Sequence, residues 1–174
     1  AAPRWYARLT RSQTIVRLDL KTREGKTALD ERLAAADLLL TSSRPAALAR
    51  LGLDFESLHA RLPRLCHLQI VGFPSPDEDL PGHDLSYQAA AGLLIRPPRL
   101  PFTLLADLVG AERAVAAAAL LLLQRRRTGE ATFGRVSLAE AATALAPPIE
   151  LGLCGAKGEV GGAHPGYALY RTRE

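Results

Sequence analysis

The stretch LCHLQIVGF, residues 65–73, decides the fold class. Apolar residues fill most of it, which predicts a strand that is buried on both faces inside a parallel sheet. A second apolar strand is predicted at DLLLT, residues 37–41, and a third at residues 132–138. From Thr14 to Leu20, β-branched and aliphatic residues alternate with polar ones, which predicts a further strand. Several short strands separated by helical sequence indicate an α/β protein.

Helical periodicity fills the intervals between these strands. Leu29 and Leu33 lie four residues apart after Thr22, a residue type that caps helices, so a helix is expected over residues 24–36. It joins the strands on either side of it in a right-handed βαβ unit. Further helices are expected at residues 46–51, 55–62, 84–94, 104–127 and 138–146, and a loop over residues 152–166. The expected fold is one α/β domain, a Rossmann-like parallel sheet flanked by helices, with a long Ala- and Leu-rich helix after the sheet.

The composition is that of a globular domain, because 48% of the 174 residues are hydrophobic and 23% are charged. The longest apolar run, Ala114 to Leu123, is about half of the roughly 20 residues needed to cross a bilayer. The N-terminal residues lack the apolar core of a signal peptide. The two cysteines have no CxxC or Cys/His spacing, which argues against a disulfide framework and a zinc site. These features predict a cytoplasmic protein with no membrane segment and no metal.

Arginine carries most of the net charge of +4, since the 22 lysines and arginines include only Lys21, Lys26 and Lys157 as lysines. A nucleic-acid binder gathers such charge into one stripe with interleaved aromatic residues. Here the arginines are spread along the chain and aromatic residues make up 5% of it, so no nucleic-acid partner is expected. The sequence also contains no GxGxxG or P-loop motif. The arginines are interpreted as solvated surface with a few sites for a phosphorylated small molecule.

Five blocks of sequence carry a family resemblance. They are LTRSQTIVRLDLK (9–21), SSRPAALARLGLDFESLHARLPRL (42–65), VGFPSPDEDLPGHDLSYQAAAGLL (71–94), LLADLVGAERAVAAAALLLLQRRRTG (104–129) and GGAHPGYALYRTRE (161–174). In this order they resemble the family III CoA-transferases and their relatives, the α-methylacyl-CoA racemases. The resemblance implies an enzyme whose substrate is a CoA thioester, with no tightly bound cofactor. It also implies a homodimer in which the two chains are interlocked.

The resemblance singles out Asp107, in LLADLVG, as the catalytic residue. In the transferases, this aspartate is the nucleophile that attacks an acyl-CoA to form a mixed anhydride, which CoA thiolate then opens. In the racemases, the same position is an acid or base that works with the histidine of GHD, here His83, on opposite faces of the α-carbon. Asp84, the next residue, either orients His83 or caps the following helix. Without the resemblance, Asp107 would be a residue of a helix N-terminus that the helix dipole favours.

The resemblance also implies where the CoA thioester is bound. Arg11 and Arg44 match family positions near the CoA nucleotide, where guanidinium groups pair with phosphate oxygens, although each is equally compatible with a solvated surface arginine. Gly72 allows the close backbone approach that a thioester carbonyl needs. Phe73 begins the segment that replaces a glycine-richer loop of the family.

Several departures from the family pattern favour a second hypothesis, a degenerate or truncated homologue that serves as a non-catalytic binding or oligomerisation module. Ser12 and Gln13 replace a glycine and a basic residue, and Glu112 lies close to the catalytic position. The sequence has no methionine, and the family pattern extends past both of its ends. The 174 residues are therefore expected to be a single large domain, without the family's N-terminal strand and small C-terminal domain.

Overall fold

The structure is a computed structural model that describes residues 2–94, 99–155, 158–162 and 164–172. Its contacts divide the chain into two compact units, Ala1–Ala36 and Asp37–Glu174. The first unit holds α1 (Pro3–Thr10) and α2 (Arg23–Ala34). The second unit holds β1 (Leu38–Thr41), α3 (Pro45–Arg50), α4 (Phe55–Arg61), β2 (Cys66–Val71), α5 (Asp84–Ala90), α6 (Leu105–Thr128), β3 (Phe133–Ser137), α7 (Leu138–Thr143), α8 (Pro147–Glu150) and the 3-10 helix η1 (Pro165–Tyr167).

The first unit confirms one predicted helix and overturns one predicted strand. The side chain of Thr22 accepts a hydrogen bond of 3.0 Å from the backbone N–H of Gly25 and so caps α2. The strand predicted over residues 14–20 is wrong, because no described strand pairs with this segment. Two of its apolar side chains are not covered either, since Ile15 is 52% exposed and Val16 is 40% exposed. Alternation favours an extended chain, but a strand also needs a neighbour to complete its hydrogen bonds.

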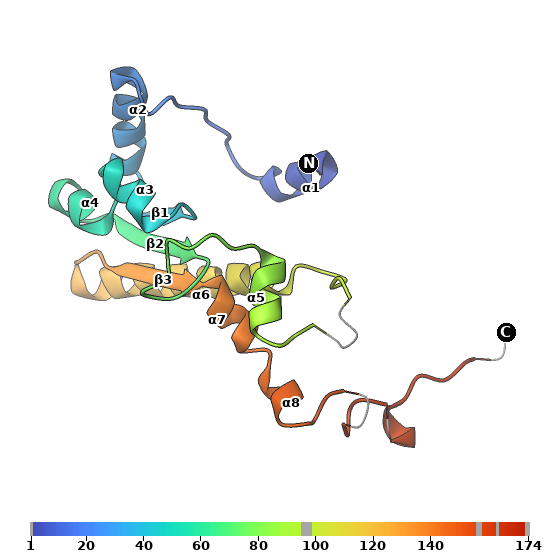
Figure 1. The fold of residues 1–174 in the computed structure, drawn as a ribbon. Helices are drawn as coiled ribbons and strands as arrows, with labels where there is room; N and C mark the ends of the chain where they lie inside the picture. The colour runs from blue at the N-terminus through green and yellow to red at the C-terminus, as the bar shows by residue number, and fades with distance from the viewer. Residues whose placement is uncertain (1, 95–98, 156–157, 163, 173–174) are drawn as a thin grey trace. The chain divides into compact units, whose positions relative to one another are not determined.

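The second unit contains the sheet, whose strands run in the order β1, β2, β3 and are all parallel. These three strands confirm the predictions made for residues 37–41, 65–73 and 132–138. Leu38 pairs with Cys66, and His67 pairs with Phe133. Figure 1 shows this sheet with α3 and α4 on the chain between β1 and β2, and with α6 between β2 and β3. The α/β fold class with a parallel sheet and flanking helices is therefore confirmed.

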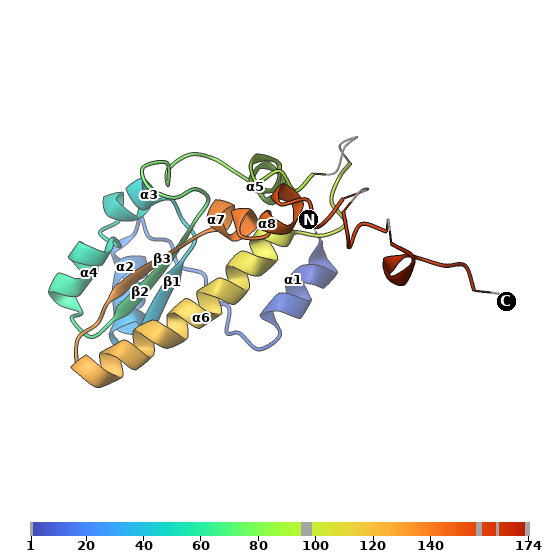
Figure 2. The same ribbon diagram turned by 90° about the horizontal axis from the view of Figure 1, so that it is seen from below.

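Strand alternation gives the sheet two different faces. On one face, Cys66 and Leu68 of β2 pack with Ala114 and Leu121 of α6 in the main apolar core. Figure 2 shows α6 running along this side of the strands. An added Cβ at Gly134 of β3 would lie 3.1 Å from the side chain of Leu121, so the helix approaches this strand closely. Every second residue of β2 therefore faces the long helix α6, and the residues between them lie on the other face of the sheet.

The helices α5, α6 and α7 form a second apolar cluster around Tyr87, Ala91, Ala106 and Ala142. The helix α5 ends earlier than predicted, at Ala90, because Gly92 adopts a positive φ of 69° two residues later.

Among the described helices, none is long and apolar enough to cross a membrane.

The helix predicted over residues 138–146 is shorter than expected, and a separate short helix follows it. The helix α7 stops at Thr143, and α8 begins at Pro147, where proline at the first helical position needs no hydrogen-bond donor. The loop predicted over residues 152–166 is confirmed where the structure describes it, up to η1, and its residues 156, 157 and 163 lie outside that part.

Candidate active site

A cavity of about 200 Å³ opens where β1 and β2 end at the same edge of the sheet. In open parallel sheets this edge, at the carboxyl ends of the strands, is where ligands bind. Three residues singled out from the sequence, Arg44, Gly72 and His83, line this cavity together. Arg44 precedes α3 and is exposed, so its guanidinium group is accessible to a ligand.

Tyr87 of α5 fills the space between two glycines at the edge of this cavity. Its side chain is only 4% exposed. A Cβ atom added to Gly72 or Gly82 would overlap the Tyr87 ring, so both positions need glycine to accommodate it. Phe73 packs edge-on against the same ring, with the two centroids 5.1 Å apart. Gly72 therefore lines the cavity, whereas Phe73 packs against one of its walls.

His83 occupies the N-cap position of α5 and is exposed at the cavity. Its backbone N–H donates to the Ser86 hydroxyl at 2.9 Å, and that hydroxyl donates to the His83 carbonyl at 2.8 Å. These two bonds fix the backbone of His83 at the start of α5. The ring is thus presented from the start of a helix, as the GHD motif predicts.

Asp84 is buried and serves as a cap for a neighbouring helix. Its Oδ1 accepts a hydrogen bond of 3.0 Å from the backbone N–H of Asp107, near the N-terminus of α6. Leu104, the N-cap residue of α6, provides no side-chain cap of its own. The Oδ2 of Asp84 accepts a bond of 2.5 Å from the side-chain amide of Gln88, which also donates to the Thr103 carbonyl at 3.3 Å. Asp84 thereby joins α5 to α6 at the position of Asp107.

Asp107 lies in the first turn of α6 and is partly buried. Burial raises the pKa of its carboxyl group above the usual value, and the negative charge of Asp84 raises this pKa further, while the charge of His83 opposes the shift. The pKa of the Tyr87 hydroxyl is also raised, by burial and by the charge of Asp107. Asp107, Asp84, His83 and Tyr87 therefore form one electrostatically coupled group. A carboxylate with a raised pKa is suited to exchange protons or to attack an electrophile.

Arg11, the remaining residue predicted from the sequence, belongs to the first unit. It follows α1 as the C-cap residue and is exposed.

Gln88 is a member of the site that sequence reasoning missed. It is fully buried, and its amide nitrogen bonds both Asp84 and Thr103. The spacing gave a signal, since Gln88 lies four residues after Asp84, and glutamine and aspartate at this distance in a helix hydrogen-bond each other.

The family model of CoA-transferase family III matches residues 1–174. The chain belongs to CoA-transferase family III. It is 47% identical over 77 residues to the cinnamoyl-CoA:phenyllactate CoA-transferase of Clostridium sporogenes, a match that covers 43% of this chain and 19% of that protein. It is 30% identical over 184 residues to the α-methylacyl-CoA racemase of Homo sapiens, covering 97% of this chain and 48% of that one.

The solved structures of other family III proteins have the same fold. The crystal structure of a CaiB/BaiF family protein from Brucella suis superimposes with a TM-score of 0.73 at 27% identity, over 85% of this chain and 42% of that one. The family III chain described here thus spans less than half the length of each of these three proteins.

Proposed function

We propose that this family III chain acts on a CoA thioester and that Asp107 is the residue that reacts. The position of Asp107 carries the proposal. Its partly buried carboxyl group lies in the first turn of α6, where the backbone N–H of Asp107 donates to Asp84. Burial and the charge of Asp84 raise the pKa of this carboxyl group, and the charge of His83 opposes the shift. The nearby cavity that His83 and Arg44 line offers a positive group for the phosphates of CoA.

In the transferase form of the reaction, a carboxylate oxygen of Asp107 attacks the acyl carbon of the thioester. The bond between carbon and sulfur breaks, and CoA leaves as a thiolate, so that a mixed anhydride with Asp107 is formed. The thiolate then attacks the Asp107 carbonyl carbon of the anhydride, the bond from this carbon to the bridging oxygen breaks, and the acyl group leaves as a free carboxylate while Asp107 carries CoA as a thioester. The acceptor carboxylate attacks this thioester and expels the CoA thiolate, which gives a second mixed anhydride. The thiolate attacks the acceptor's carbonyl carbon in that anhydride, so that the new acyl-CoA leaves and the carboxylate of Asp107 is restored. Covalent catalysis of this kind divides one difficult acyl transfer into easier steps.

In the racemase form, Asp107 and His83 act on opposite faces of the carbon next to the thioester. One of them removes the α-proton, and the electron pair moves into the carbonyl group to give an enolate. The other then returns a proton to the opposite face. Both groups need to titrate near the working pH, and the raised pKa of Asp107 supports this role.

The remaining features of the proposal concern the whole protein. We propose a homodimer in the cytoplasm that takes acyl-CoA and CoA as its substrates and has no tightly bound cofactor, with residues 1–174 belonging to one large domain. Arg44 and Gly72 are proposed to contact CoA, and Phe73 is proposed to support Gly72 through Tyr87. Arg11, in the first unit, is proposed as a residue that binds a phosphate of CoA.

The test is an isotope and exchange assay on the 174-residue chain. The protein is incubated in D₂O with a 2-methylacyl-CoA, alone or with a free carboxylate, and the products are analysed by mass spectrometry. Deuterium at the α-carbon without a carboxylate acceptor indicates a racemase, and formation of the CoA thioester of the added carboxylate, with release of the donor acid, indicates a transferase. Asp107→Asn should lower the rate at least about 100-fold, the scale of a lost acid, base or nucleophile.

Asp77→Asn is the matched control, because Asp77 is exposed in the loop that precedes α5. It should retain the wild-type rate. An Asp107→Asn variant with full turnover contradicts the proposal. A well-folded sample that shows no CoA binding by calorimetry would support the second hypothesis, a non-catalytic homologue, which the exposed Glu112 on α6 also favours. Detectable CoA affinity would count against that hypothesis.

A further inference from the structure

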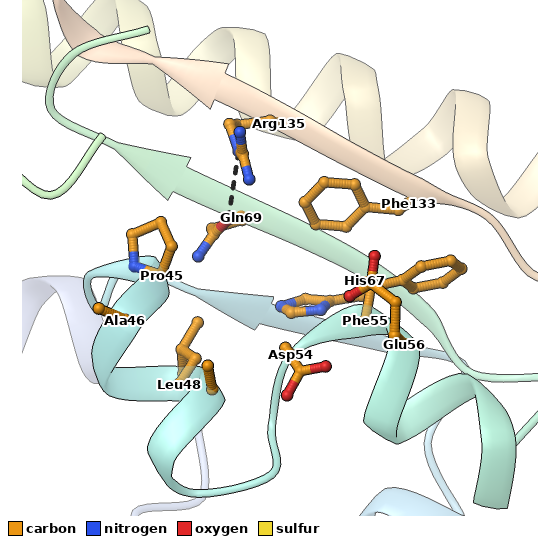
Figure 3. Close-up of a pocket in the computed structure, with 11 residues that line it drawn as sticks. Pro45, Ala46, Leu48, Asp54, Phe55, Glu56, His67, Gln69, Phe133 and Arg135 are labelled. Carbon is orange, nitrogen blue, oxygen red and sulfur yellow. Dashed lines mark hydrogen bonds between the residues drawn. The ribbon is translucent and has the colours of Figure 1, made fainter. Parts of the chain in front are cut away.

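A second cavity, of about 300 Å³, lies on the face of the sheet opposite α6. Figure 3 shows His67 and Gln69 of β2 and Phe133 and Arg135 of β3 pointing from the sheet toward α3 and α4. None of the described residues that line this sheet-face cavity also lines the cavity of His83 and Arg44. It is therefore a separate site, and nothing in the proposed reaction uses it.

His67 presents an unused polar atom in the sheet-face cavity. Its side chain is 1% exposed, and its Nε2 shares a hydrogen bond of 2.9 Å with the Thr41 hydroxyl. No described residue bonds the buried Nδ1. Buried polar atoms nearly always have a hydrogen-bond partner. When Nε2–H donates to Thr41, Nδ1 carries a lone pair that can accept a hydrogen bond from a ligand.

The charges at the sheet-face cavity favour a cationic ligand. Asp54 and Glu56, at the start of α4, both line it. The carboxylate of Asp54 also caps α4, since it accepts bonds of 2.9 Å and 2.8 Å from the backbone N–H and the hydroxyl of Ser57, and each of its oxygens keeps a further lone pair and the negative charge. The one arginine among its described lining residues, Arg135, is already paired, because its Nη1 bonds Glu78 at 2.5 Å and its Nε donates to Gln69 at 3.2 Å. An anion in this cavity would be repelled by two carboxylates, and among the described lining residues no unpaired arginine offsets this repulsion.

Aromatic side chains form the apolar wall of the sheet-face cavity. The rings of Phe55 and Phe133 pack with centroids 5.5 Å apart, and the His67 ring meets Phe133 edge-on at 5.4 Å. Aromatic faces attract cations as well as other rings. A flat ring can therefore pack here while its N–H groups face the carboxylates.

We propose that the sheet-face cavity binds a compact planar cation of the amidine or aminated heteroaromatic class. The ring of this ligand packs against Phe55 and Phe133. Its N–H groups donate to the carboxylates of Asp54 and Glu56 and to Nδ1 of His67. The volume of the cavity accommodates one small ring.

The test uses benzamidine as the probe, with benzoate and benzamide as partners of the same shape and different charge. Binding to the 174-residue chain is measured by calorimetry, and the histidine ring signals are followed by NMR. Benzamidine should bind more tightly than benzamide, benzoate should not bind, and the signal of His67 should shift. Equal binding of benzoate, or shifts confined to other histidines, would overturn the proposal.

The variant Glu56→Gln keeps the fold intact, because Glu56 is exposed at the rim. It should weaken benzamidine binding about two- to fivefold, the effect of one partly exposed ion pair. Glu130→Gln, an exposed glutamate after α6, should leave binding unchanged. Unchanged affinity in Glu56→Gln would overturn the proposal. Displacement of benzamidine by CoA would also overturn the proposal, because that result places the probe at the Asp107 site. Transferase or racemase activity tests only the proposed function of Asp107, so the two proposals can fail independently.

Discussion

The carboxylate of Asp84 caps the helix that carries Asp107, through a hydrogen bond of 3.0 Å from the Asp107 backbone N–H to Asp84 Oδ1. The two residues are 23 positions apart in the chain. One buried carboxylate therefore fixes the start of α6 and also raises the pKa of the Asp107 side chain. The fold and the chemistry of the site depend on the same contact.

Asp84→Ala should destabilise the protein by about 1–3 kcal/mol, because it removes a helix cap and leaves the amide of buried Gln88 with one partner fewer. Urea unfolding measures the change. Asp77→Ala, an exposed aspartate in a loop, should change stability by less than about 0.5 kcal/mol. Equal effects of the two substitutions would contradict the capping role.

Asp107→Asn should raise the stability of the fold at neutral pH. Burial and Asp84 raise the pKa of Asp107 above the usual 3.8, so the folded state holds this proton more tightly than the unfolded state. The charged form therefore costs stability above the folded pKa, and the cost disappears as the pH falls through that pKa toward 3.8. Thermal unfolding of the variant and the wild type should show a gap at neutral pH that closes in acid. A gap that widens in acid would contradict this assignment.

The sequence predicts those parts of the fold that depend on local pattern. The apolar run in β2 is confirmed as a strand whose side chains are nearly all buried. The long helix α6 is confirmed because its Ala, Leu and Arg residues favour a helix even where they are exposed. Residues 14–20 have an equally good strand pattern, yet they form no strand, because pairing depends on a partner that local sequence does not reveal.

The candidate site also has residues that the sequence predicts and contacts that it does not. The resemblance to the family pointed to Asp107, His83 and Arg44. His83 and Arg44 line one cavity, and the charge of His83 acts on Asp107. A capping role for Asp84 was one of the two predictions, but that it caps α6 and not the helix that follows it could not be predicted, because this depends on how α5 and α6 pack. The sheet-face cavity could not be predicted for a different reason. His67 lies within an apolar strand, and an apolar run does not show which of its side chains face α6 and which face the opposite side of the sheet.

Gly72→Ala should destabilise the protein by about 1–3 kcal/mol, since an added methyl group overlaps the hydroxyl of buried Tyr87. Tyr87→Phe in the same chain removes the oxygen that overlaps and leaves Cζ at 3.1 Å from the new Cβ. The double variant should therefore recover part of the lost stability in urea unfolding. Gly166→Ala is the control, because its added Cβ would meet no atom within 4 Å. Additive losses in the double variant would contradict the overlap.

His67 should make the fold less stable as the pH falls below its usual pKa of 6.5. Burial lowers the pKa of His67, the charges of Asp54 and Glu56 partly oppose this shift, and that of Arg135 adds to it. The unfolded chain therefore takes up a proton at a higher pH than the folded chain does, and stability is lost between 6.5 and the lower folded pKa. His67→Gln should flatten this part of the curve of unfolding free energy against pH.

His164→Gln is the control for this curve, because the side chain of His164 is exposed and lies far along the chain from the sheet-face cavity. The control should keep the wild-type slope. A slope that survives in His67→Gln would mean that another group binds the proton. Benzamidine in the sheet-face cavity should steepen the loss of stability on acidification, since a proton on Nδ1 of His67 removes the lone pair to which the ligand donates.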